Sequence, residues 1–169
     1  SGGAISTAYN GTLNMVFTSS SGGPNITKLV SPVIDASGLA GTRLSFAYGQ
    51  EFWSPDQNYL NVYYRDSPTG TWNLVWSDST NQAAWTLDTV LIPSTSAMLQ
   101  VAFEGIDNFG RANVVDDVTI EEGLLQGAVG VVCTTPGASS SIIFSEDFDN
   151  NNAGWTGDVN AGNGSWEIP

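Results

Sequence analysis

Two predicted strands carry carboxylates on their apolar faces, and these carboxylates are the side chains best placed to do chemistry. Segment 114–120 (VVDDVTI) alternates like a β-strand, which places Asp116 on the same face as apolar neighbours. Segment 142–149 (IIFSEDFD) repeats the pattern, with Glu146 between two phenylalanines on one face. A carboxylate in such a position costs free energy unless it is paired, protonated or bound to a cation.

Basic partners for these carboxylates are scarce, because the chain has 4 Lys and Arg residues against 17 Asp and Glu residues. The two strands therefore predict a bound hard cation, and the oxygen-rich surroundings favour calcium. We expect Asp116 and Glu146 to bind one calcium ion, with backbone carbonyls helping to complete the coordination. The candidate metal ligands are the acidic residues of the two segments: Asp116, Asp117, Glu146, Asp147 and Asp149.

The composition excludes several functional classes. The net charge of −13 argues against nucleic-acid binding, since four basic residues cannot form a basic patch, although solubility explains such acidity equally well. The absence of histidine excludes histidine-dependent triads and His-containing zinc sites. A two-carboxylate glycosidase stays open by residue type, with Glu51, Glu104 and Asp107 available, but nothing singles out a pair. We therefore predict a protein that is not an enzyme.

Cysteine content and the chain start bear on processing and location. Cys133 is the single cysteine, so no internal disulfide can form, and we expect a buried or incidental thiol rather than an interchain cross-link. The sequence has no apolar run of membrane length and no signal peptide, so we expect no membrane insertion. Because it begins with Ser-Gly-Gly and no methionine, we interpret it as a processed or excised piece.

Short segments with a period of two residues run through most of the chain, and none has a helical period. Residues 44–48 and 60–64 alternate apolar and polar side chains, and the turn 66–70 leads into a further alternating segment. Many short strands separated by turns predict an all-β fold, an antiparallel β-sandwich of the jelly-roll type.

The character of the chain changes after Glu122, which predicts three parts. We expect residues 1–122 to form the jelly-roll body and residues 123–141, with their Thr-, Pro-, Gly- and Ser-rich run, to form a linker. Residues 142–169 carry one strand and two tryptophans, too little for a core of their own. They must complete a sandwich, either their own or that of a neighbouring copy.

Several of these segments, taken in order, resemble the MAM-like (meprin, A5, receptor phosphatase mu) jelly rolls, particularly those of secreted adhesins of Bacteroidetes. The resemblance implies a secreted or cell-surface β-sandwich used for adhesion or carbohydrate contact, often with calcium beside the acidic pair of the last strand. The matching elements are 29–35 (LVSPVID), 44–48 (LSFAY), 59–65 (YLNVYYR), Trp72 with Trp85, 101–105 (VAFEG) and 114–120.

The order of elements departs from that family. Such domains open with an acidic-aromatic strand followed by two tryptophans, whereas here Glu146, Trp155 and Trp166 come last. Two explanations fit: a window cut out of phase from a tandem array, or a C-terminal strand that completes the neighbouring copy. We favour donation to a neighbour, giving a head-to-tail homopolymer, over docking on the same chain. The residues expected to fill the recipient core are Ile142, Phe144, Phe148, Trp155 and Trp166.

Aromatic residues suggest a second functional class, a monomeric carbohydrate-binding module of a secreted polysaccharide-active protein. Most tryptophans and tyrosines are expected to pack in the core or across strands. Phe52 and Trp53 are the exception, because they precede a loop that contains proline, and Tyr59 follows it. We expect Phe52, Trp53 and Tyr59 to be the candidate residues for a surface polysaccharide.

Overall fold

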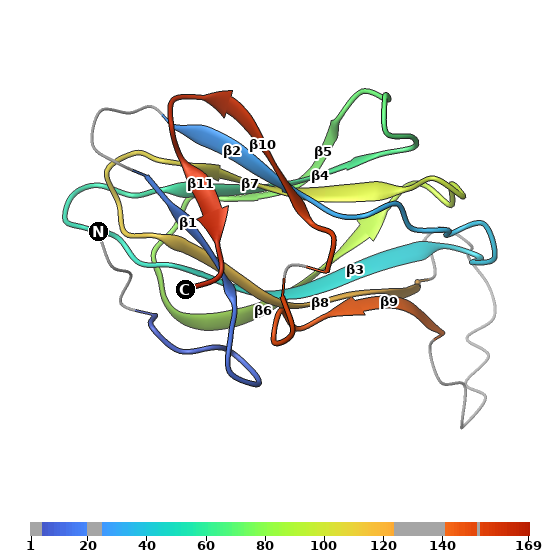
Figure 1. The fold of residues 1–169 in the computed structure, drawn as a ribbon, viewed down its shortest axis with the longest axis horizontal. Coiled ribbons are helices and arrows are strands. Elements are labelled where there is room, and N and C mark those ends of the chain that lie inside the picture. Colours follow the sequence, from blue (N-terminus) through green and yellow to red (C-terminus); the bar gives the residue numbers. More distant parts are fainter. Residues whose placement is uncertain (1–4, 20–24, 124–140, 152) are drawn as a thin grey trace, which may run out of the picture.

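The structure, a computed structural model, describes residues 5–19, 25–123, 141–151 and 153–169. In these residues the strands form two antiparallel sheets that face each other, with no helix (Figure 1). One sheet has the order β11 (Ser165–Glu167), β1 (Met15–Thr18), β8 (Asn113–Glu122), β3 (Thr42–Gln50), β6 (Gln82–Ile92), and β9 (Ile142–Glu146) also pairs with β8. The other has the order β10 (Thr156–Ala161), β2 (Ile26–Val30), β7 (Gln100–Ile106), β4 (Tyr59–Arg65), β5 (Asn73–Asp78). The predicted all-β antiparallel sandwich is confirmed.

Alternate side chains of the strands fill the space between the sheets. Leu44 and Phe46 of β3 and Val62 of β4 are fully buried, as the period of two predicts. Phe46 packs against Phe103 of β7 with ring centroids 5.1 Å apart, so the core joins the two sheets. Burial of one such side chain contributes about 1.5–3 kcal/mol. The largest fully buried apolar side chains are Trp155, Phe17, Phe46, Phe103, Phe148 and Leu29.

Strand β8 changes partner halfway along its length. Its first half pairs with β1 as far as Val115, and its second half pairs with β9 from Val118 onward. Asp116 and Asp117 lie between, where the register of β8 against β3 also shifts and Asp117 adopts a φ of 47°. A positive φ is uncommon outside glycine, and aspartate is among the residues that tolerate it best. The bulge therefore sets both acidic residues at the junction of β1 and β9.

The described part of the C-terminal segment completes the sandwich of its own chain. Its strands β9 and β11 join the first sheet, and β10 forms an edge of the second (Figure 1). Phe148 and Trp155 are 0% and 1% exposed, and Trp166 donates its Nε1–H to the Thr27 carbonyl at 2.9 Å. In this structure the segment thus docks in cis. Its insertion into a neighbouring copy stays a prediction.

The expectation that Ile142 shares the buried face of β9 is wrong. Ile142 is 57% exposed, whereas Ile143 and Phe144 pack against the core. The reason is a register shift in the pairing of β8 with β9: Ile120 lies opposite Phe144, but Glu121 lies opposite Ile142. Such a bulge interrupts the alternation of a strand, and it turns Ile142 out of the core.

Most of the predicted linker lies outside the described residues. Residues 124–140, which include Cys133, belong to this part, so the expectations for the linker and for the thiol stay predictions. The residues that flank this part of the chain lie next to each other, since Glu122 donates its backbone N–H to the Ser141 carbonyl at 3.1 Å. The C-terminal segment therefore begins beside the end of β8.

Candidate cation-binding cleft

Three segments that are far apart in the sequence meet at the β8 bulge. They are the loop 9–13 before β1, the bulge itself, and residues 146–150 at the end of β9 and beyond it. Between them lies a cleft of about 640 Å³, which we call the acidic cleft. The acidic and amide side chains on its walls are Asn10, Asp117, Glu146, Asp147 and Asn150.

Asp116 lies behind this cleft and holds the N-terminal loop. Its carboxylate is fully buried, and its Oδ2 accepts hydrogen bonds from the backbone N–H groups of Tyr9 (2.8 Å) and Asn10 (3.4 Å). Its Oδ1 accepts a third from the N–H of Asp117 at 2.8 Å. Burial raises the pKa of Asp116 to about 6, although these three donors favour the ionised form. The predicted buried position of Asp116 is confirmed, while its role as a direct metal ligand stays a prediction.

Asp149 holds the same loop from the other side. Its Oδ1 accepts hydrogen bonds from the Thr12 N–H (2.6 Å), the Thr12 hydroxyl (3.1 Å) and the Leu13 N–H (2.9 Å). Gly11 lies in this loop just before Thr12 and has a φ of 69°. A Cβ at Gly11 would collide with the Asp149 carboxylate, so the loop requires glycine. The backbone donors hold the pKa of Asp149 below its usual range.

The carboxylates on the cleft walls repel one another. Burial and then the charge of Asp147 raise the pKa of Asp117, against the effect of a side-chain hydrogen bond from Asn10. Burial also raises the pKa of Glu146, even though its Oε1 accepts the Phe148 N–H at 2.8 Å, and Asp147 adds to the rise. The ion pairs found in the described part of the chain involve other carboxylates: Glu51, Glu104 and Glu121.

The donor set of the acidic cleft fits a hard cation. It offers carboxylate and amide oxygens, and Ca²⁺ takes six to eight oxygen ligands from such groups. Positive charge here would offset both the burial and the repulsion that raise the pKa values of Asp117 and Glu146. Within the described ranges, no three acidic, histidine or cysteine side chains already form one metal-ligand group.

The structure adds two residues that the sequence did not suggest. Asn10 and Asn150 lie in loops, and only the tertiary contacts of Asp116 and Asp149 with the loop 9–13 bring them to the cleft. The asparagine-rich run 150–152 after β9 was the available signal, because asparagine often supplies oxygens to calcium.

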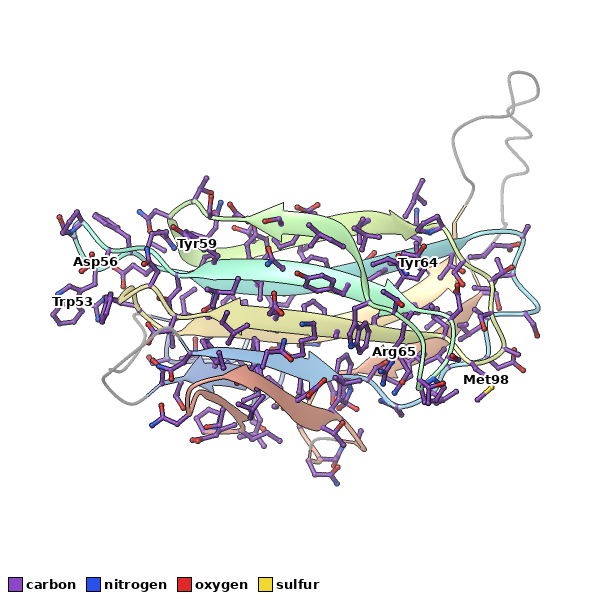
Figure 2. All side chains as sticks on the ribbon, turned by 90° about the horizontal axis from the view of Figure 1, so that it is seen from above. Trp53, Asp56, Tyr59, Tyr64, Arg65 and Met98 are labelled. Atoms are coloured by element: carbon purple, nitrogen blue, oxygen red, sulfur yellow. The ribbon has the colours of Figure 1, made fainter. Side chains whose placement is uncertain are left out.

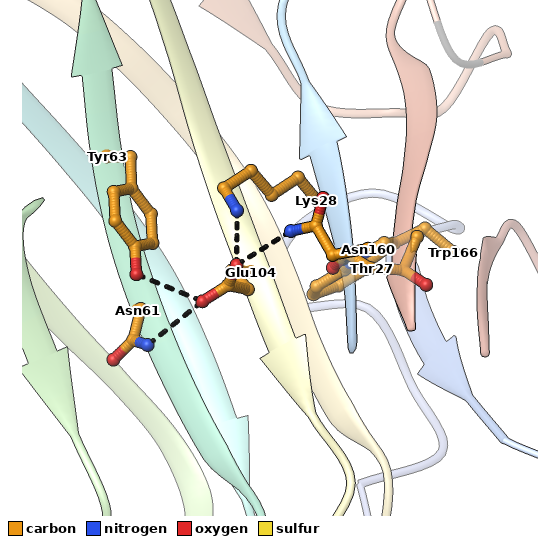
Figure 3. A network of polar contacts seen from close by, with 7 residues as sticks. All are labelled: Thr27, Lys28, Asn61, Tyr63, Glu104, Asn160 and Trp166. Carbon is orange, nitrogen blue, oxygen red and sulfur yellow. Dashed lines mark hydrogen bonds and ion pairs between the residues drawn. The ribbon is translucent and has the colours of Figure 1, made fainter. Parts of the chain in front are cut away.

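A buried polar network on the second sheet was also missed (Figure 3). Lys28 of β2 forms an ion pair with Glu104 of β7, and the two residues are 7% and 5% exposed. Glu104 further accepts hydrogen bonds from Asn61 (3.2 Å), Tyr63 (3.1 Å) and Asn160 (3.0 Å). Burial alone would raise the pKa of Glu104, but the bonds from Lys28, Asn61 and Tyr63 outweigh it and hold the pKa below its usual range.

This set of five residues, the Glu104 network, lies on the outer face of its sheet. Leu29 and Phe103, the neighbours of Lys28 and Glu104 along their strands, belong to the core, so the charged pair points away from it. The sequence signal was one lysine and one glutamate inside otherwise uncharged strands, ITKLV and QVAFEGI. Their register, Lys28 opposite Glu104, was not deducible from either strand alone.

The three aromatic residues expected to face a ligand are exposed. Phe52, Trp53 and Tyr59 are 41%, 53% and 36% exposed. Trp53 and Tyr59 lie toward one end of the sandwich and Met98 toward the opposite end (Figure 2). Contact with a polysaccharide stays a prediction.

The acids considered for a glycosidase are held by separate partners. Glu51 forms an ion pair with Arg111, and Glu104 belongs to its own network. Asp107 accepts a hydrogen bond from the Ser19 hydroxyl at 2.5 Å. Each of the three has a structural partner, and none of them lines the acidic cleft.

The two antiparallel sheets and the loop-built cleft define an all-β sandwich module. The family profile of the MAM domain (meprin/A5/mu) matches residues 6–124, and the chain belongs to this family. MAM domains are non-catalytic adhesion domains found in extracellular or surface proteins. A comparison with curated protein sequences found no match. In the described residues, no helix is long and apolar enough to cross a membrane.

Proposed function

We propose that this chain is a structural and adhesive module of a secreted surface protein, stabilised by calcium in the acidic cleft. One observation carries the proposal: three carboxylates from β8 and from the end of β9 line one cleft, and two of them have raised pKa values there. Asp117, Glu146 and Asp147 would hold the ion, with amide oxygens of Asn10 and Asn150. Bound calcium would supply the positive charge that the chain itself does not place there.

The location expected for a MAM domain agrees with such a site. Extracellular modules bind calcium with dissociation constants of about 10⁻⁴–10⁻³ M, which suffices outside the cell. The cleft spans the loop 9–13, the body and the C-terminal segment. An ion there would therefore fasten the loop before β1 and the start of the C-terminal segment to β8.

Thermal unfolding with calcium and with a chelator tests this proposal. An ion bound only by the folded state stabilises it by about 2.7 kcal/mol at a concentration 100 times its dissociation constant. We expect calcium to raise the melting temperature and the chelator to reverse the rise. A melting curve that is the same in calcium and in chelator would contradict the proposal.

We also propose that the C-terminal segment is exchanged between copies, so that modules assemble head to tail. The contacts that dock β9, β10 and β11 in cis would be the same between two chains. Residues 124–140 can span roughly 56–61 Å when extended, enough to reach an adjacent module. A donation of this kind is heterologous and propagates into a filament rather than closing into a dimer.

Sedimentation velocity over rising protein concentration tests the exchange. We expect the intact chain to form larger species as concentration rises. A chain truncated after Ser140 should stay monomeric and unstable, and a peptide of residues 142–169 should restore its folding. An intact chain that stays monomeric at every concentration, or a truncated chain that still polymerises, would contradict the exchange.

A further inference from the structure

Two loops at one end of the sandwich expose large aromatic side chains. The first loop, 51–58, joins β3 to β4 and carries Phe52 and Trp53, and the second, 107–112, joins β7 to β8 and carries Phe109. Phe109 is 63% exposed and Trp53 is 53% exposed. With Tyr59 at the start of β4, these residues form what we call the aromatic end: Phe52, Trp53, Tyr59 and Phe109.

Phe109 is unfavourable for the fold in two respects. It has a φ of 62°, a conformation that costs free energy for a bulky residue, and its ring lies largely in water. The conformation is fixed by a turn in which the Phe109 N–H donates to Asp107 Oδ1 at 2.9 Å. Asparagine or glycine would adopt this backbone more readily. A feature that disfavours folding and is nevertheless held in place points to a role in binding.

Both loops are held rigidly, so the rings are presented without a large loss of entropy on binding. Backbone hydrogen bonds between Trp53 and Asp56 close the first loop in both directions, at 2.8 and 2.6 Å. The buried Asn58 then joins the loops, because its Oδ1 accepts the N–H groups of Asn108 and Gly110, each at 2.9 Å. The aromatic end is therefore a preformed surface.

Trp53 is supported on one face of its ring. The Arg111 guanidinium stacks there, 4.7 Å from the ring centroid, and is itself paired with Glu51. This contact fixes the orientation of an indole that is still half exposed. The ring is set up to stack against a flat, weakly polar partner.

The charges and polar groups around the rings select the kind of partner. Glu51, Asp56 and Asp107 outnumber the single cation Arg111, which Glu51 already neutralises, so a polyanion finds no attraction here. Amide side chains lie among the rings: Asn108 donates to the Tyr59 hydroxyl at 3.3 Å. Exposed rings interleaved with amides suit a sugar ring, whose C–H face stacks on an indole while its hydroxyls bond to amide groups.

We propose that the aromatic end binds a neutral polysaccharide, with Trp53 and Phe109 as the stacking residues. None of its residues lines the acidic cleft, so this binding is independent of calcium. The surface would give the module a carbohydrate contact in addition to any assembly through its C-terminal strands.

Affinity electrophoresis of the intact chain in native gels tests the proposal. The probes are mixed-linkage β-glucan, xyloglucan and galactomannan, with alginate as an acidic counterpart, each run in calcium and in chelator. We expect at least one neutral polymer to retard the protein in both conditions, and alginate to have no effect. Trp53→Ala and Phe109→Asn should each weaken the binding at least tenfold. Phe109→Asn should meanwhile leave the melting temperature unchanged or raise it, because it relieves the backbone.

Leu74→Ala is the matched control, since Leu74 is 54% exposed on β5, away from both loops, and this variant should bind like the unmodified chain. Any one of three results would overturn the proposal: no retardation in any neutral gel, retardation of Trp53→Ala equal to that of the unmodified chain, or retardation by alginate alone. Concentration-dependent self-association that Trp53→Ala abolishes, without sugar binding, would assign the surface to a second copy and would also overturn it.

Discussion

Two groups of carboxylates in this sandwich differ in how their charge is compensated. Glu104 is 5% exposed, but Lys28, Asn61 and Tyr63 hold its pKa below its usual range. Glu146 is 8% exposed, yet its pKa is raised, and that of nearby Asp117 is raised as well. The Glu104 network is electrostatically complete, whereas the acidic cleft is not. Two similarly buried glutamates thus differ in compensation: the chain itself supplies the donors for Glu104, whereas for Glu146 we propose a bound cation.

Both regions depend on the C-terminal segment, and this gives the largest expected effect. Phe148→Ala removes a fully buried ring two residues after Glu146 and should lower the free energy of unfolding by about 3–5 kcal/mol. Urea unfolding measures it. Ile142→Ala, at an exposed position of the same segment, should cost less than about 0.5 kcal/mol. Equal costs for the two variants would mean that the segment does not dock as described.

Disrupting the Glu104 network should have the next largest effect on stability. Glu104→Leu leaves the Lys28 ammonium buried without its partner, and we expect a loss of about 3 kcal/mol in the free energy of unfolding. Adding Lys28→Met to the same chain should recover at least half of this loss, because the unpaired charge is gone. A double variant no more stable than Glu104→Leu would show that the pairing is not the source of the effect.

The carboxylates at the acidic cleft should make the free energy of unfolding depend on pH in the opposite direction from a carboxylate in an ordinary ion pair. Asp116 has a folded-state pKa of about 6, above its unfolded value near 4, so the folded state binds more protons between these values. Its contribution is present below pH 4 and is lost as pH rises through 6. The raised pKa values of Asp117 and Glu146 act in the same direction.

Without calcium, the free energy of unfolding should therefore fall by about 2 kcal/mol between pH 4 and pH 7. Groups with lowered pKa values, such as Glu104 and Asp149, keep their contribution above their unfolded pKa values near 4 and lose it as pH falls further. Urea unfolding at several pH values in chelator measures the change, and added calcium should reduce it. Stability that rises across the window in chelator would contradict the description of the cleft.

The smallest effect should come from a single isosteric change in the cleft. Asp117→Asn removes one repelling charge and retains a residue that tolerates a positive φ. In chelator it should raise the free energy of unfolding by about 0.5 kcal/mol, because solvent screens a partly exposed charge. In calcium the same variant should be less stable than the unmodified chain. A loss of stability in both conditions would assign Asp117 a purely structural role.

The sequence predicted the sandwich and the acidic strand positions because both follow from local alternation. The buried position of Asp116 was deducible in this way, and the exposure of Trp53 followed from its place before a proline-containing loop. The loop 9–13 was not, since it is placed by contacts with Asp116 and Asp149 more than a hundred residues away. The exposure of Ile142 depends on a bulge, which no period of two can indicate.

Calorimetric titration of the intact, chelator-treated protein with calcium at pH 7 tests the central claim most directly. We predict one binding site per chain, with heat that is lost in the Asp117→Asn/Glu146→Gln double variant and retained in Glu104→Gln. The double variant should still be folded, as its far-ultraviolet circular dichroism would confirm. Absence of binding to the unmodified chain, or equal binding by the double variant, would contradict the assignment of the acidic cleft as a calcium site.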